Sequence, residues 1–117
     1  MTPEQMRART KQFTINVLRF VATIPRSPVH DRIAVQLADA ASAGGSAYRS
    51  ACRARSRADF IYKLGNAIEE IDESAFWLEV LTESGVCEAA ATRPLWKEAD
   101  ELTRILVKSR GTARSNG

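Results

Sequence analysis

A chain of 117 residues with 44% hydrophobic residues has the size of a single domain and can bury a core of its own. No uncharged stretch approaches the roughly 18 residues that span a bilayer, and residues 1–12 carry charges throughout instead of the apolar run of a secretory signal. The net charge of +3 is small, and we expect a cytoplasmic protein that contacts no membrane.

The first predicted helix covers residues 4–24. Its apolar positions recur at alternating spacings of four and three residues, which is typical of one face of an amphipathic helix. Pro25 ends this pattern, because its ring and its missing N–H do not suit a helix interior. The positions on this face are Met6, Thr10, Phe13, Val17, Phe20 and Ile24.

A second helix is predicted to begin at Pro28, with Ser27 as its N-cap. Its core face repeats the same spacing but consists mostly of small residues, which let another helix approach closely. Gly44 and Gly45 each cost about 1 kcal/mol relative to alanine in a helix interior. We therefore expect this helix to depend on tertiary contacts. The predicted core face holds Ile33, Leu37, Ala40, Gly44, Ala47 and Ala51.

The third predicted helix begins near Arg57. Ser56 followed by Asp59 resembles a capping box, with aspartate in place of the usual glutamate or glutamine. Gly85 marks the end of the helix, because glycine is common just past a helix C-terminus. The predicted core face holds Phe60, Ile61, Leu64, Ile68, Ile71, Ala75 and Leu78.

A fourth helix is predicted from about residues 92–94 to Lys108, with Leu95, Ala99, Leu102 and Leu106 on its core face. Short connections force consecutive helices to run antiparallel, so the pattern predicts an all-α fold, an up-down-up-down four-helix bundle. We place the bundle domain at residues 1–110 and expect a disordered C-terminal tail over residues 111–117.

A second apolar stripe lies on the predicted third helix, away from its core face. Tyr62, Phe76 and Val80 fall nearly opposite that face on a helical wheel, and Trp77 lies on the same flank. Clustered exposed aromatic residues indicate an interface, here with another copy of the chain. The alternative is that the helix has a wide apolar arc because two neighbours cover it at once.

Charge is distributed unevenly along the chain. Residues 1–57 hold ten lysines and arginines against three acids, whereas residues 58–117 hold seven against eleven. A cluster near the end of the second helix can bind an RNA or DNA backbone, because arginine contacts phosphates and stacks on bases. The alternative is that these cations complement the helix dipole and pair with acids elsewhere. The cluster consists of Arg49, Arg53, Arg55 and Arg57.

No catalytic, metal or cofactor site is predicted. A di-iron bundle needs two Glu-x-x-His pairs, but His30 is the only histidine and no glutamate precedes it by three residues. Residue spacing alone does not exclude pairing of His30 with Cys52 or Cys87, although buried bundle cysteines are usually inert. Residues 42–46 are glycine-rich but lack the lysine of a phosphate-binding loop. We therefore expect a protein that is not an enzyme.

Three segments of the sequence resemble a known family. They are Ser42-Ala-Gly-Gly-Ser-Ala-Tyr-Arg-Ser50, Arg55-Ser-Arg-Ala-Asp-Phe-Ile-Tyr-Lys-Leu64 and Glu69-Glu-Ile-Asp-Glu-Ser-Ala-Phe-Trp-Leu-Glu79. With them, residues 10–110 resemble the four-helix-bundle proteins related to the 23S ribosomal RNA intervening-sequence protein. The accessory variability determinant of diversity-generating retroelements is a relative in this group.

The resemblance implies a homo-oligomer, typically a barrel-like pentamer of four-helix bundles, without known catalytic activity. Together with the basic cluster, it favours a non-enzymatic scaffold that contacts RNA, DNA or a nucleic-acid-bound protein. The alternative is a protein–protein interaction adaptor that binds no nucleic acid and uses the apolar stripe.

Overall fold

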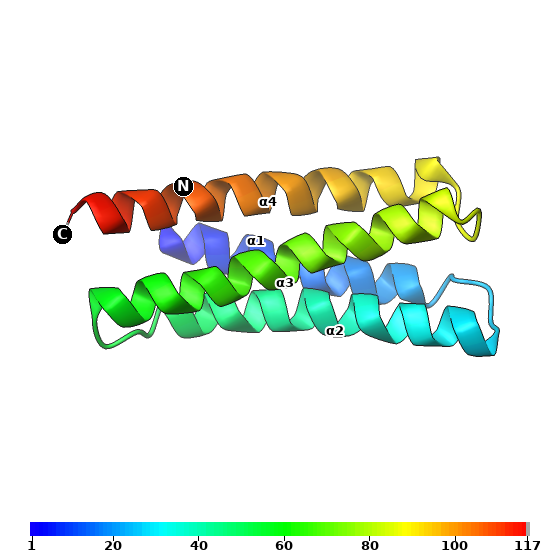
Figure 1. Ribbon diagram of the computed structural model, residues 1–117, viewed down its shortest axis with the longest axis horizontal. Helices are drawn as coiled ribbons and strands as arrows, with labels where there is room; N and C mark the ends of the chain where they lie inside the picture. The colour runs from blue at the N-terminus through cyan, green and yellow to red at the C-terminus, as the bar shows by residue number, and fades with distance from the viewer. Residues whose placement is uncertain (117) are drawn as a thin grey trace.

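Four α-helices run alternately up and down along one long axis in the computed structural model, which describes residues 1–116 (Figure 1). They are α1 (Pro3–Val21), α2 (Pro28–Ala51), α3 (Arg57–Glu83) and α4 (Ala89–Ser115). The bundle measures 48 × 21 × 20 Å. Each helix packs against the next, and α4 also contacts α1, which closes the ring. The predicted up-down-up-down bundle is therefore confirmed.

The helix starts depend on capping side chains that satisfy free backbone N–H groups. The Ser27 hydroxyl accepts a hydrogen bond from the His30 N–H, and Pro28 occupies the first turn of α2. The Ser56 hydroxyl likewise accepts from the Asp59 N–H at the start of α3. Both predicted starts are thus confirmed.

The core lies along the inner faces of all four helices, as the residue spacing predicts. Phe13, Leu64 and Leu102 are buried, and Ile33 is half-buried and packs against the core. Burial of these side chains holds the helices together, because removing apolar surface from water is the main favourable contribution to folding. Within residues 1–116, no helix is long and apolar enough to cross a membrane.

The small residues of α2 bring it close to both neighbouring helices. A Cβ atom placed on Gly44 would lie 2.6 Å from Cγ1 of Ile71 in α3. A Cβ atom placed on Gly45 would lie 2.8 Å from the Thr14 hydroxyl of α1, which donates a 2.8 Å hydrogen bond to the Ala41 carbonyl. The expected close approach is therefore made on both sides of α2.

Three predicted boundaries are wrong. The helix α1 ends at Val21, although Ile24 beyond it is buried in the turn as part of the core. The helix α4 begins at Ala89 and continues through Ser115, so residues 111–115 are helical where a disordered tail was expected. No proline interrupts this last stretch, and its end is held where the Arg57 guanidinium donates a 2.9 Å hydrogen bond to the Asn116 carbonyl. Gly117 lies outside the described residues.

Candidate functional site

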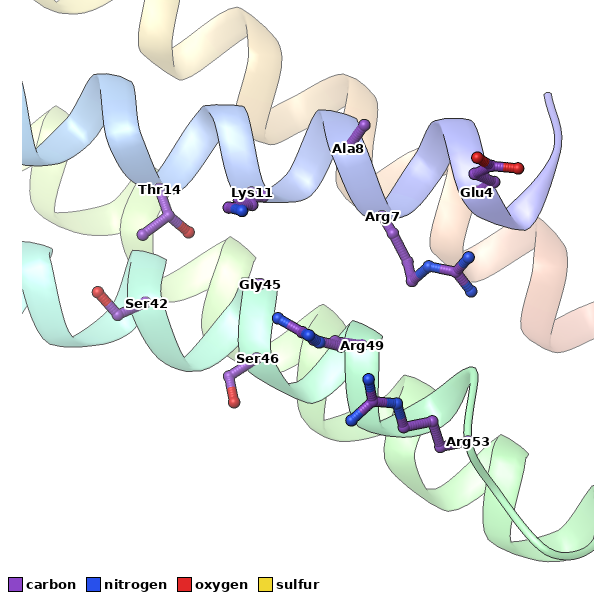
Figure 2. A pocket seen from close by; sticks show the side chains of 10 residues that line it. All are labelled: Glu4, Arg7, Ala8, Lys11, Thr14, Ser42, Gly45, Ser46, Arg49 and Arg53. Atoms are coloured by element: carbon purple, nitrogen blue, oxygen red, sulfur yellow. The ribbon is translucent and has the colours of Figure 1, made fainter.

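A surface groove with a volume of about 700 Å³ lies between the first half of α1 and the last half of α2. We call it the basic groove, because four cationic side chains line it (Figure 2). Arg7 and Lys11 lie one turn apart on α1, whereas Arg49 lies near the end of α2 and Arg53 just beyond it. The antiparallel arrangement places the start of α1 beside the end of α2, so residues far apart in sequence meet here.

Figure 2 shows how the cations of the basic groove are oriented. The Arg7 side chain extends from α1 toward α2, and the Arg49 and Arg53 side chains lie along the facing side. All four cationic residues are exposed to solvent. Several cations that share one solvent-accessible groove raise the local concentration of anions there.

The positive charge of the basic groove is not neutralised within residues 1–116. Among the described residues, none of its four cations lies within 4.0 Å of a carboxylate oxygen, and Glu4 is the one acidic residue that lines it. Arg9 differs, because it pairs with Glu98 at 2.7 Å and with Glu101 at 3.1 Å on the α4 side. These carboxylates raise the pKa of Arg9, with the Glu98 hydrogen bond as the largest cause. An anion from outside the chain can therefore compensate the groove charge.

Small residues form the floor of the basic groove. Ala8 lies on α1, and Ser42, Gly45 and Ser46 lie on α2. This floor is a consequence of packing, because Gly45 is needed for the close approach of α1. Short side chains leave space between the two rows of cations, and the serine hydroxyls can donate hydrogen bonds to a ligand that enters.

The same end of the bundle gathers further positive charge. Both chain termini lie toward this end (Figure 1). The final part of α4 contributes Lys108, Arg110 and Arg114, and no acidic residue follows Glu101 in the sequence. The charge asymmetry therefore runs along the bundle axis as well as along the sequence.

The structure separates the four arginines of the predicted basic cluster. Arg49 and Arg53 line the basic groove, whereas Arg55 lies in the turn between α2 and α3. Arg57 begins α3 and donates its hydrogen bond to a backbone carbonyl near the end of α4. Sequence reasoning missed Arg7 and Lys11. Their spacing of four residues on the polar face of the first predicted helix was the available signal.

The apolar stripe is partly exposed and partly covered. Tyr62 and Phe76 are 68% and 53% exposed, whereas Val80 and Trp77 are half-buried. The Phe76 and Trp77 rings meet edge to face, with centroids 5.0 Å apart. The Trp77 indole N–H is buried without a hydrogen-bond partner among the described residues. Cover by neighbouring helices thus explains why Trp77 and Val80 are apolar, but it does not explain the exposed rings of Tyr62 and Phe76.

His30 and Cys52 lie at opposite ends of α2 and do not form a pair. The length of α2 places His30 and Cys52 about 30 Å apart, since an α-helix rises 1.5 Å per residue. Cys87 is half-buried, and burial raises the pKa of its thiol, which disfavours the reactive thiolate. No group of three metal-ligating side chains occurs within the part of the chain that the structure describes.

Comparisons with known proteins agree with this fold. The model of the family described as 23S rRNA-intervening sequence protein matches residues 5–108. A crystal structure from Bacteroides thetaiotaomicron, of a protein with unknown function from the S23 ribosomal protein family, superposes with a TM-score of 0.83. The two chains are 22% identical over 95% of this chain and 99% of the other. No curated protein matches the chain.

Proposed function

The chain belongs to the 23S rRNA-intervening sequence protein family, and we propose that it is a non-enzymatic, homo-oligomeric helical bundle that binds RNA or DNA through the basic groove. The observation that supports binding is the meeting of Arg7, Lys11, Arg49 and Arg53 without an acidic partner within residues 1–116. Nucleic-acid phosphates provide the negative charge that such a groove lacks.

The type of contact follows from the side chains available. Arginine donates from a planar fork that matches phosphate oxygens, and lysine acts as a mobile point charge. Most protein–nucleic acid hydrogen bonds go to phosphate and sugar, which fixes position without reading sequence. The basic groove therefore supports binding driven by charge, in which condensed counterions are released from the nucleic acid.

Self-association is supported by the apolar stripe. Tyr62 and Phe76 expose two aromatic rings on one helix, and such surfaces commonly mark contacts between protein chains. We propose that copies of the chain associate through this stripe into a closed ring, with a pentamer as the expected assembly. Light scattering at low and high salt measures the mass directly, and a mass of several times 12.9 kDa is expected.

Nucleic-acid binding is tested with a double variant and a matched control. Replacing Arg49 and Arg53 by alanine removes two positive charges from the basic groove. Replacing Arg93 and Arg104 by alanine removes the same charge from exposed positions on α4. Fluorescence anisotropy with labelled RNA and DNA at 50 mM salt is expected to show weaker binding for the groove variant alone. Absence of binding by the unaltered protein would refute this function.

A second candidate function is that of a protein–protein adaptor. It is favoured by the exposed Tyr62 and Phe76 rings on α3, because a different protein could cover them in place of a second copy of the chain. A mass of 12.9 kDa in solution, together with no nucleic-acid binding at low salt, would favour the adaptor.

A further inference from the structure

We infer that the basic groove holds one sugar–phosphate backbone of a double helix, and that it neither stacks nor reads unpaired bases. This inference rests on the proposed function and names the class of nucleic acid. It follows from three properties of the groove, which are its cation spacing, its size and the chemistry of its lining.

The cations form two facing rows. Arg7 and Lys11 are four residues apart on α1, and Arg49 and Arg53 are four residues apart at the end of α2. Four residues of α-helix span about 6 Å, which is the spacing of the α1 row, and Arg53 follows Arg49 in the turn after α2. Neighbouring phosphates of one duplex strand rise about 3.4 Å along the axis and also rotate around it, so they lie about 6–7 Å apart. The spacing within a row is therefore close to that of two neighbouring phosphates, and the two rows can hold one strand from both sides.

The size of the groove limits what can enter it. A volume of about 700 Å³ is that of a small-molecule site and is too small for a whole duplex. One backbone of a duplex is a ridge of phosphates that can enter alone. The floor of Gly45, Ser42 and Ser46 lets this ridge approach α2, where the serine hydroxyls can contact phosphate or sugar oxygens.

Of the described residues, none that lines the basic groove is aromatic. Proteins that bind single strands without sequence preference combine a basic groove with aromatic side chains on which successive bases stack. Tyr48, on the same part of α2, is buried and cannot serve as such a platform. A flexible single strand would lose conformational freedom on binding without gaining stacking, whereas a duplex is already ordered. The geometry therefore favours the duplex.

The test compares labelled ligands of equal length with the full-length protein. We would measure fluorescence anisotropy with two unrelated 20-base-pair RNA duplexes, one DNA duplex and a 20-nucleotide oligouridine, from 50 to 200 mM salt. The duplexes are expected to bind at least tenfold more tightly than oligouridine, and the two RNA sequences within about threefold of each other. Tighter binding of oligouridine would overturn the inference but leave nucleic-acid binding intact. Failure of every ligand to bind would refute the proposed function itself.

Two pairs of substitutions test the two rows of cations. One variant carries Arg7→Ala with Lys11→Ala, and the other carries Arg49→Ala with Arg53→Ala. For a duplex, each pair should reduce the magnitude of the negative slope of log affinity against log salt by about 2. Arg93→Ala with Arg104→Ala should leave the slope nearly unchanged. If only one of the two double variants changes the salt slope, the inference that both rows contact the strand would be overturned. Circular dichroism melting should show that all three variants stay folded, because the replaced side chains are exposed.

Inorganic polyphosphate serves as the competitor that separates a duplex site from a general anion site. It presents a flexible chain of phosphates without the fixed spacing of a double helix. At equal phosphate concentration it is expected to displace the duplex poorly. Displacement as effective as that by unlabelled duplex would overturn the inference.

Discussion

Arg9 of α1 and Glu98 of α4 form a two-point contact, with Nε donating to Oε2 at 2.7 Å and Nη2 donating to Oε1 at 2.7 Å. It joins the first and last helices, and both side chains are less than one-third exposed, at 24% and 29%. Partial burial makes this pair stronger than a fully solvated ion pair.

Arg9→Ala is expected to lower the free energy of unfolding by about 1 kcal/mol, because it removes the two-point contact and leaves Glu98 without its partner. Urea denaturation measures this change. Arg104→Ala serves as the control, because Arg104 pairs with Asp100 in an exposed position, at 79% exposure, and should cost less than about 0.5 kcal/mol. Equal effects of the two substitutions would contradict this prediction.

Gly44→Ala is expected to destabilise the bundle by about 1–3 kcal/mol, because the new methyl group would meet Ile71 of α3 at 2.6 Å. Gly111→Ala is the matched control on another helix. Within residues 1–116, no atom outside the adjacent backbone of α4 lies within 4 Å of a Cβ at that position, so alanine should stabilise α4 by about 0.5–1 kcal/mol. Thermal unfolding followed by circular dichroism should therefore show shifts of opposite sign. A stabilised Gly44→Ala protein would argue against close packing of α2 and α3.

Local sequence signals predict the helix starts and the core well. Ser27 and Ser56 act as caps where expected, because capping depends on a few adjacent residues. The end of α4 was mispredicted, because the contact between Arg57 and Asn116 joins residues that are distant in sequence. Local residue patterns do not contain such contacts.

The candidate site was predicted only in part for the same reason. Arg49 and Arg53 belong to one helix end and its turn, so their spacing reveals them as a cluster. Arg7 and Lys11 complete the basic groove only through the pairing of α1 with α2. Sequence proximity also grouped Arg57 with Arg49 and Arg53, but it does not show that the Arg57 side chain turns toward α4.

Glu70 predicts a pH dependence of stability. Burial, and then repulsion by Glu73 and Glu69, raises the pKa of Glu70 above its ordinary value. A carboxyl whose pKa is higher in the folded state favours folding when it is protonated, so its penalty develops as pH rises from the unfolded pKa to the folded pKa. Glu70→Gln is therefore expected to stabilise the protein at pH 7.

The pH profile of this variant provides its own control. The gain in unfolding free energy of Glu70→Gln should shrink as pH falls below the ordinary glutamate range, where the carboxyl is protonated in both states. Urea denaturation at pH 7 and near pH 4 measures the difference. A gain that is independent of pH would show that the raised pKa of Glu70 is not its cause.

The apolar stripe predicts the response of the assembly to charge. Tyr62→Glu with Phe76→Glu is expected to reduce the mass measured by light scattering to the 12.9 kDa of a single chain, because buried carboxylates in an apolar contact are costly. Leu18→Glu with Val107→Glu places the same charges on apolar residues that are 45% and 43% exposed on other helices. This control should keep the mass of the unaltered protein. Loss of assembly in the control alone would show that copies of the chain contact one another through α1 and α4 and not through α3.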